Sequence, residues 1–261
     1  MEGKVKGSGA GSEIAYGFPG LEVLEKNIPR LQQIASALFI SLLLFSAGCT
    51  APAVPPREFD CAAFRPTDPK KVKVKVSLNN QMLYVMEGNR PLMVTPTCVG
   101  KKATPTPKGS FSIFLKQAKR RANTRGFWVH EARKEIRLGR NTGRPSGGGW
   151  RFLGYPMGHW CEFAPAYGIH AGWVHPTPST RGCLRIHRNV APKFFALVSV
   201  GTKVHIADSQ VEDLTLGQGV LRPTDFNHPE FPPEIMFTDK IFERATSSPL
   251  LEEASVEEKS A

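Results

Sequence analysis

Residues 71–76 read K-V-K-V-K-V, a strict alternation of basic and apolar side chains. A period of two places the three valines on one face, as in a strand with one buried and one solvent-facing side. Residues 81–86 (Q-M-L-Y-V-M) follow a turn-forming Asn-Asn pair, and residues 92–94 resume a strand after a second turn at 87–89. The sequence therefore predicts that the domain opens with β-strands joined by tight turns.

The same pattern of short strands continues downstream, at residues 110–115, 168–170 and 203–206. Residues 189–198 have the apolar spacing of a helix. Residues 116–151 instead carry eleven basic and two acidic side chains and a Ser-Gly-Gly-Gly run. We expect this stretch to form a long lid-like excursion with a short helix near 129–138. The domain over residues 71–207 is predicted to be mainly β with one or two helices.

The chain has 261 residues, 41% of them hydrophobic, which fits one sizeable globular domain. The net charge of +11 is uneven: residues 49–207 hold 26 basic and 7 acidic side chains, whereas residues 208–261 hold 4 and 12. A basic body attracts polyanions, either nucleic acid or a carboxylate-rich bacterial cell wall. We predict that 208–261 is an acidic, partly disordered tail, solvated rather than packed against the body.

An apolar run at residues 34–48 ends in small residues followed by Cys49. It is shorter than the roughly 20 apolar residues of a spanning helix and has the form of an export signal. It resembles a bacterial lipoprotein signal, in which Cys49 becomes lipidated. An uncleaved membrane anchor and ordinary secretion are alternatives, and all three place the body outside the cytoplasm. We assign residues 1–48 to targeting and 49–70 to a Pro-rich tether.

Histidines and cysteines concentrate in one segment, which contains His159, Cys161, His170, His175, Cys183 and His187. A metal site is one interpretation, but there is no C-x-x-C pair and the spacing is irregular. A thiol nucleophile with a histidine base is another: Gly182 permits a tight turn, and Arg181 and Arg185 flank Cys183 and favour its thiolate. A third interpretation leaves Cys183 and His170 as ordinary buried residues.

Two stretches, I-H-A-G at 169–172 and P-S-T-R-G-C-L-R at 178–185, resemble the signature of the L,D-transpeptidase catalytic domain (YkuD-like) family. Residues 76–85, the T-P-T-P-K-G-S-F run at 104–111 and the G-T-K-V-H-I strand at 201–206 also resemble the family. The similar stretches extend over most of residues 71–207 and follow one another in the same order as in the family. It implies a mainly β fold, an L,D-transpeptidase-like β-sandwich with one or two short helices and a long basic lid insertion.

The resemblance implies that Cys183 is the nucleophile and His170 the general base, with the carbonyl of Ala171 orienting the imidazole. The amides of Gly182 and Cys183 would help to form the oxyanion hole. Substrate contacts are implied for Arg185, Arg181 and Thr180. Arg181 stands where most members have a histidine, so no base can act from that position. The resemblance implies no metal and no organic cofactor.

The implied activity is peptidoglycan L,D-transpeptidation in the periplasm, by a monomer tethered to the membrane through Cys49. Cys183 would attack the third residue of a stem peptide, release the terminal D-amino acid and pass the acyl group to an amine. One rival is hydrolysis of the same thioester, by an L,D-carboxypeptidase or cross-link hydrolase. A second alternative is a non-catalytic wall-binding lipoprotein. A third is a nucleic-acid binder, but the export signal argues against it. One disulfide is allowed among Cys61, Cys98 and Cys161.

Overall fold

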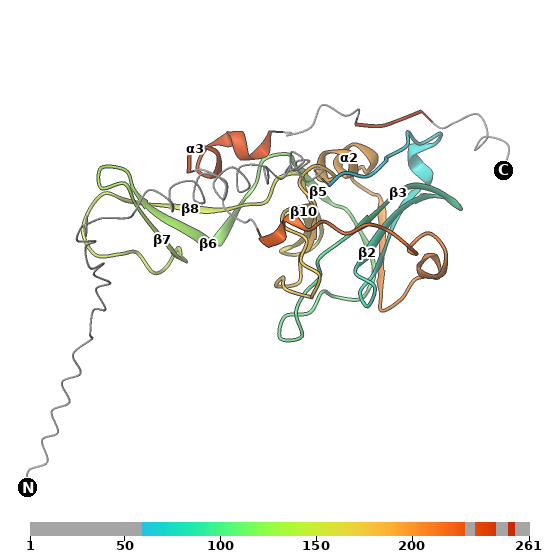
Figure 1. Ribbon diagram of the computed structural model, residues 1–261, viewed down its shortest axis with the longest axis horizontal. Coiled ribbons are helices and arrows are strands. Elements are labelled where there is room, and N and C mark those ends of the chain that lie inside the picture. Colours follow the sequence, from blue (N-terminus) through green and yellow to red (C-terminus); the bar gives the residue numbers. More distant parts are fainter. Residues whose placement is uncertain (1–58, 228–232, 244–249, 254–261) are drawn as a thin grey trace, which may run out of the picture. The chain divides into compact units, whose positions relative to one another are not determined.

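The computed structural model describes residues 59–227, 233–243 and 250–253 (Figure 1). The expected export signal, Cys49 and the first part of the expected tether lie outside these residues. Within the described part of the chain, no helix is both long and apolar enough to cross a bilayer.

A five-stranded sheet opens the domain. Its strands are β1 (Val72–Ser77), β2 (Met82–Glu87), β3 (Arg90–Pro96), β4 (Gly109–Ser112) and β12 (Lys203–Ala207), in the order β3-β2-β1-β12-β4. The three valines of β1 are buried, while Lys73 between them is exposed. The alternation in the sequence thus predicted both the strand and its buried face. The closing strand β12 pairs in parallel with β1, which joins the two ends of the domain.

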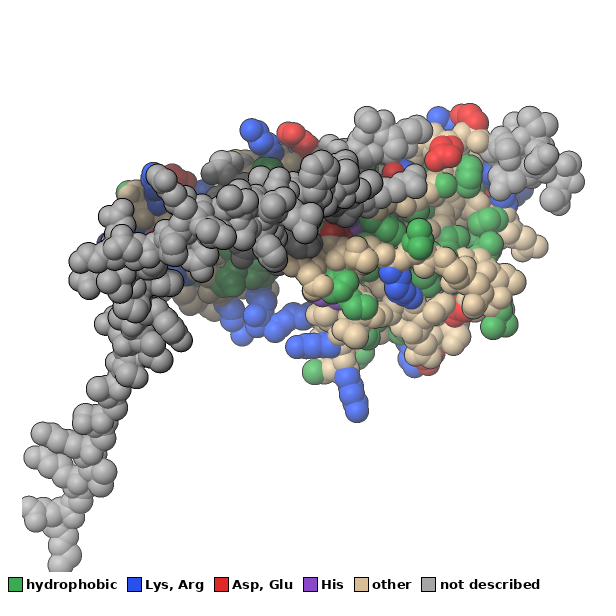
Figure 2. Space-filling model, in the orientation of Figure 1, with side chains coloured by type: hydrophobic (Ala, Val, Ile, Leu, Met, Phe, Trp, Pro, Cys, Tyr) green, Lys and Arg blue, Asp and Glu red, His purple; other side chains and the backbone are tan. Residues whose placement is uncertain are grey.

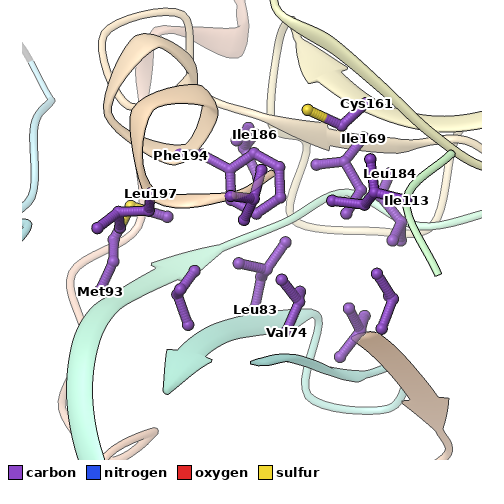
Figure 3. Close-up of a cluster of buried hydrophobic side chains, with 14 of the residues drawn as sticks. Val74, Leu83, Met93, Ile113, Cys161, Ile169, Leu184, Ile186, Phe194 and Leu197 are labelled. Carbon is purple, nitrogen blue, oxygen red and sulfur yellow. The ribbon is translucent and has the colours of Figure 1, made fainter. Parts of the chain in front are cut away.

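A second sheet has the order β11-β10-β9-β5. Its strands are β5 (Leu115–Gln117), β9 (Trp160–Ala164), β10 (Tyr167–Ala171) and β11 (Leu184–Ile186), and the helix α2 (Ala191–Leu197) follows β11. Figure 3 shows the core between the layers, where Val74 and Leu83 of the first sheet face Ile169 and Leu184 of the second, beside Phe194 of α2. The predicted mainly β fold and the predicted helix over 189–198 are confirmed.

The basic excursion forms a third sheet that leaves the body between β5 and β9 (Figure 1). It consists of β6 (Arg121–His130), β7 (Glu135–Arg140) and β8 (Trp150–Pro156), in the order β7-β6-β8. The short helix predicted near 129–138 is wrong, because a turn at residues 131–134 joins two paired strands. Glu131 to Lys134 favour a helix locally, but pairing of Val129 with Ile136 and the aromatic contacts of this sheet prevail.

The last part of the assigned tether belongs to the folded domain. Ala63 is completely buried, and the amide of Phe64 donates to the carbonyl of Leu92 in β3. The ammonium of Lys193 in α2 lies 2.9 Å from a carboxylate oxygen of Asp60. A tether over all of 49–70 is therefore a wrong boundary, because residues 59–70 hold apolar side chains that cover the core. The short helix η1 (Pro69–Lys71) leads from them into β1.

The first part of the acidic tail also packs against the body, which corrects the prediction that it is solvated. It contains the short helices η2 (Val211–Leu214), η3 (Asp225–Asn227), α3 (Pro233–Met236) and η4 (Asp239–Phe242). Glu212 forms an ion pair of 2.5 Å with Lys75, and Asp213 accepts a hydrogen bond of 2.6 Å from the Tyr84 hydroxyl.

Figure 2 shows Lys and Arg side chains protruding along the lower edge of the view, as expected for a basic body.

Candidate active site

Parallel pairing of β10 with β11 brings the predicted nucleophile and base together. Ile169 is opposite Leu184, so Cys183, the residue just before β11, lies beside Gly168. The backbone of Gly168 forms a hydrogen bond with the Cys183 thiol. Alternate residues of a strand point to the same side, so Gly168 and His170 share a face. Cys183 and His170 therefore belong to one site, although they are 13 positions apart in the sequence.

His170 is held in one orientation by a backbone contact. Its Nδ1 lies 2.8 Å from the carbonyl oxygen of Ala171, the contact that the resemblance implied. A carbonyl only accepts, so Nδ1 carries the proton and Nε2 is left as the basic nitrogen. Burial, with smaller contributions from the positive charges of Arg185 and Arg120, lowers the pKa of His170 to about 4, although the hydrogen bond to Ala171 acts in the opposite direction. The imidazole is therefore neutral near pH 7.

The loop that presents Cys183 is built by Thr180 and Gly182. The Thr180 hydroxyl donates to the carbonyl of Cys183 at 2.6 Å and accepts the amide of Gly182 at 3.1 Å. Gly182 has a φ of +102°, and a Cβ there would lie 2.4 Å from the Tyr167 ring, so only glycine fits. Thr180 is buried and organises the loop, which differs from the substrate contact we expected. The Gly182 amide already has an acceptor in the Thr180 hydroxyl.

The charge environment of Cys183 differs from the sequence prediction. Burial raises the pKa of the Cys183 thiol, and this outweighs the lowering by the Gly168 hydrogen bond, Arg120 and Arg185. Arg181, expected to favour the thiolate, is exposed and is not among the charges that act on it. The prediction of a lowered pKa is therefore wrong, since it weighed flanking charge and not burial.

Arg185 is held beside His170 by contacts with Ser179 and Cys98. Its register partner in β10 is His170, and its Nη2 donates to the Ser179 hydroxyl at 2.6 Å. The sulfur of Cys98 lies 3.6 Å from the same nitrogen. The side chain runs over Gly172, where a Cβ would lie 2.8 Å from Cδ of Arg185. The guanidinium is therefore held in place next to the base, where a carboxylate of a substrate could reach it.

Two charged residues that the sequence analysis did not single out, Arg120 and Glu162, also border the site. Arg120 lies in the long basic run, where nothing distinguishes it from its neighbours. Glu162 had a usable signal, because it is the only charged residue in the otherwise apolar strand W-C-E-F-A and is 8% exposed. A buried acid in such a strand must have partners, and this points to a role.

The remaining cysteines and histidines lie outside this pair. Cys61, Cys98 and Cys161 are free thiols, so none of them forms a disulfide. His187 is buried rather than in a surface loop, and its Nε2 lies 2.9 Å from a carboxylate oxygen of Asp225. In the described ranges, no three His, Cys, Asp or Glu side chains are grouped so as to hold a metal ion.

These observations define a mainly β domain in which a cysteine and a histidine lie on one face of two neighbouring strands. The model of the YkuD family, the L,D-transpeptidase catalytic domain, matches residues 71–206, more than half of the chain. The chain therefore belongs to the family of L,D-transpeptidase catalytic domains.

Individual relatives are distant. The inferred L,D-transpeptidase YkuD of Bacillus licheniformis is 30% identical over 138 residues, which are 51% of this chain and 64% of that protein. Solved L,D-transpeptidases from Stackebrandtia nassauensis and Mycobacterium smegmatis are 16% and 18% identical, with TM-scores of 0.39 and 0.40. Those matches cover 57% and 52% of this chain, and 60% and 58% of the solved chains. The chain thus spans less than two thirds of the length of each relative.

Proposed function

We propose that the protein is a peptidoglycan L,D-transpeptidase that works through a thioester on Cys183. In the first step Sγ attacks the carbonyl carbon of the third stem-peptide residue while Nε2 of His170 takes the thiol proton. The amide of Cys183 donates to the developing oxyanion. When the C–N bond to the terminal D-amino acid breaks, His170 returns the proton to the leaving amine, and the thioester remains.

In the second step an acceptor amine attacks the thioester. His170 takes a proton from the amine, the C–S bond breaks, and Cys183 leaves with that proton. The product is a cross-link, an attached protein or an exchanged D-amino acid, depending on the amine. Arg185 and the basic surface suit a substrate that carries carboxylates.

One observation carries the proposal: β10 and β11 pair in parallel and set Cys183 beside Gly168, on the face that carries His170. The contact between Nδ1 of His170 and the Ala171 carbonyl supports it, since it leaves Nε2 as the acceptor of the thiol proton. Family membership supports the same assignment.

The test is intact-protein mass spectrometry of the full chain with a carbapenem, beside a Cys183→Ala variant. We expect a covalent adduct on the parent protein only. A tetrapeptide donor is then supplied with and without a competing D-amino acid. Transfer to the amine supports a transpeptidase, whereas release of tripeptide alone indicates an L,D-carboxypeptidase. A folded parent that forms no adduct would favour a non-catalytic wall-binding protein and would refute the mechanism.

We also propose that the protein acts in the periplasm as a monomer, tethered through a lipid on Cys49. The support is the sequence of residues 34–49, an apolar run that ends in small residues and a cysteine. Metabolic labelling with an alkyne fatty acid should mark the parent and not a Cys49→Ser variant. Equal labelling of the two would exclude Cys49 as the lipidated residue.

A further inference from the structure

Glu162 in β9 is a buried carboxylate on which three hydrogen-bond donors converge. Its Oε1 accepts the amide of Ala166 at 2.9 Å. Its Oε2 accepts Nε1–H of Trp160 at 3.0 Å and Nη1–H of Arg120 at 3.4 Å. A carboxylate is an acceptor only, so it matches three donors, whereas an amide would face at least one of them with its own N–H.

The Oε1 side of Glu162 leads to the nucleophile. Ala166 lies in the turn between β9 and β10 with a φ of +64°, which residues other than glycine seldom adopt. Its carbonyl oxygen lies 3.7 Å from Sγ of Cys183. Glu162 therefore fixes, through the Ala166 amide, the same residue whose carbonyl contacts the thiol.

The Oε2 side leads to the base. The indole of Trp160 lies next to the His170 ring, with 5.7 Å between the ring centroids, and the Arg120 guanidinium is 4.3 Å from the centroid of Trp160. A Cβ on Gly168 would come within 2.6 Å of the indole, so the ring fills the space beside the strand that carries His170. Glu162 accepts hydrogen bonds from both Trp160 and Arg120. It therefore fixes the indole that packs against the His170 imidazole, together with the guanidinium stacked on that indole.

We propose that Glu162 is a positioning residue for acyl transfer, holding the turn beside Cys183 with one carboxylate oxygen and the Trp160–Arg120 stack beside His170 with the other. The proposal deepens the proposed function and rests on it for the acylation readout. Glu162 contacts neither reacting side chain directly, so it acts through its three partners. Its charge also acts on the site, since Glu162 raises and Arg120 lowers the pKa of Cys183.

The experiment compares the full-length parent with Glu162→Gln, which keeps the size of the side chain and removes one acceptor and the charge. We expect carbapenem acylation to slow about 10- to 100-fold, because displacement of reacting groups by about 1 Å has effects of this size. Alkylation of Cys183 by iodoacetamide, followed by peptide mass spectrometry, should reach half its maximal rate at lower pH, since a negative charge is gone. The matched control is Glu131→Gln, at an exposed carboxylate that pairs with Arg151.

A slower acylation with an unmoved alkylation profile would assign Glu162 a structural role and overturn the proposal. Acylation at the parent rate, or an equal loss in Glu131→Gln, would overturn it as well. If the parent itself forms no adduct but the alkylation profile shifts in Glu162→Gln, the transpeptidase assignment fails while the action of Glu162 on the Cys183 thiol stands. If the parent is acylated and Glu162→Gln matches it in both assays, the assignment stands and positioning fails.

Discussion

Acid should destabilise the fold through His170 in a defined pH window. The pKa of His170 falls from an ordinary 6.5 to about 4 because the ring is buried, which corresponds to about 3 kcal/mol of folding free energy. The folded-state pKa is the lower one, so the unfolded chain binds more protons between these values. The contribution of neutral His170 to the free energy of folding is therefore complete above pH 6.5. It is lost as the pH falls towards 4.

The assay is urea unfolding at several pH values between 7 and 4, for the parent and for His170→Gln. Glutamine stays neutral and can still donate to the Ala171 carbonyl. We expect the free energy of unfolding of the parent to fall by about 3 kcal/mol more than that of the variant across the window. Burial also lowers the pKa of His159 and of His175, but these groups are common to both proteins and cancel in the difference. Equal losses in the two proteins would refute a buried neutral His170.

Three further substitutions test the packing around the site and the tail, each by urea unfolding. Gly168→Ala would place a Cβ 2.6 Å from the Trp160 ring; we expect a loss of about 1–3 kcal/mol together with slower carbapenem acylation. Phe194→Ala empties the centre of the core and should cost about 3–5 kcal/mol, whereas a cost under 1 would contradict the packing described. Asp213→Asn replaces one of the two oxygens that accept from the Tyr84 and Ser77 hydroxyls with a donor and should cost about 1–3 kcal/mol, while the exposed Asp208→Asn stays within about 0.5.

Most of the fold could be predicted because local patterns and tertiary packing agree. The alternation at residues 71–76 and the helical spacing at 189–198 are reproduced as β1 and α2. The error at 129–138 has a physical cause, since E-A-R-K at 131–134 favours a helix while the flanking aromatic and β-branched residues pair across two strands. A short stretch of sequence does not show which distant strand it will pair with, so its local preference can be overridden.

For the candidate site, the residue types could be predicted but their electrostatics could not. Gly182 and Cys183 stand next to each other in the sequence, and the loop conformation follows from that pair. The pKa of Cys183 depends instead on burial by other elements, which outweighs the charge of the flanking arginines. The sequence does mark Glu162 as the only charged residue of an apolar strand, but it does not show the partner Arg120, which is 42 positions away.

The burial of His170 and the partial burial of Cys183 determine the charges of the two side chains at rest. Burial raises the pKa of the Cys183 thiol and lowers that of the His170 imidazole, so both groups are uncharged near pH 7. A resting thiolate–imidazolium pair requires the opposite order of the two pKa values. In the proposed mechanism, proton transfer to Nε2 would therefore accompany attack on the substrate, and the Gly168 backbone, Arg120 and Arg185 would stabilise the sulfur. No part of this step needs a base at Arg181, so the arginine at that position is compatible with catalysis.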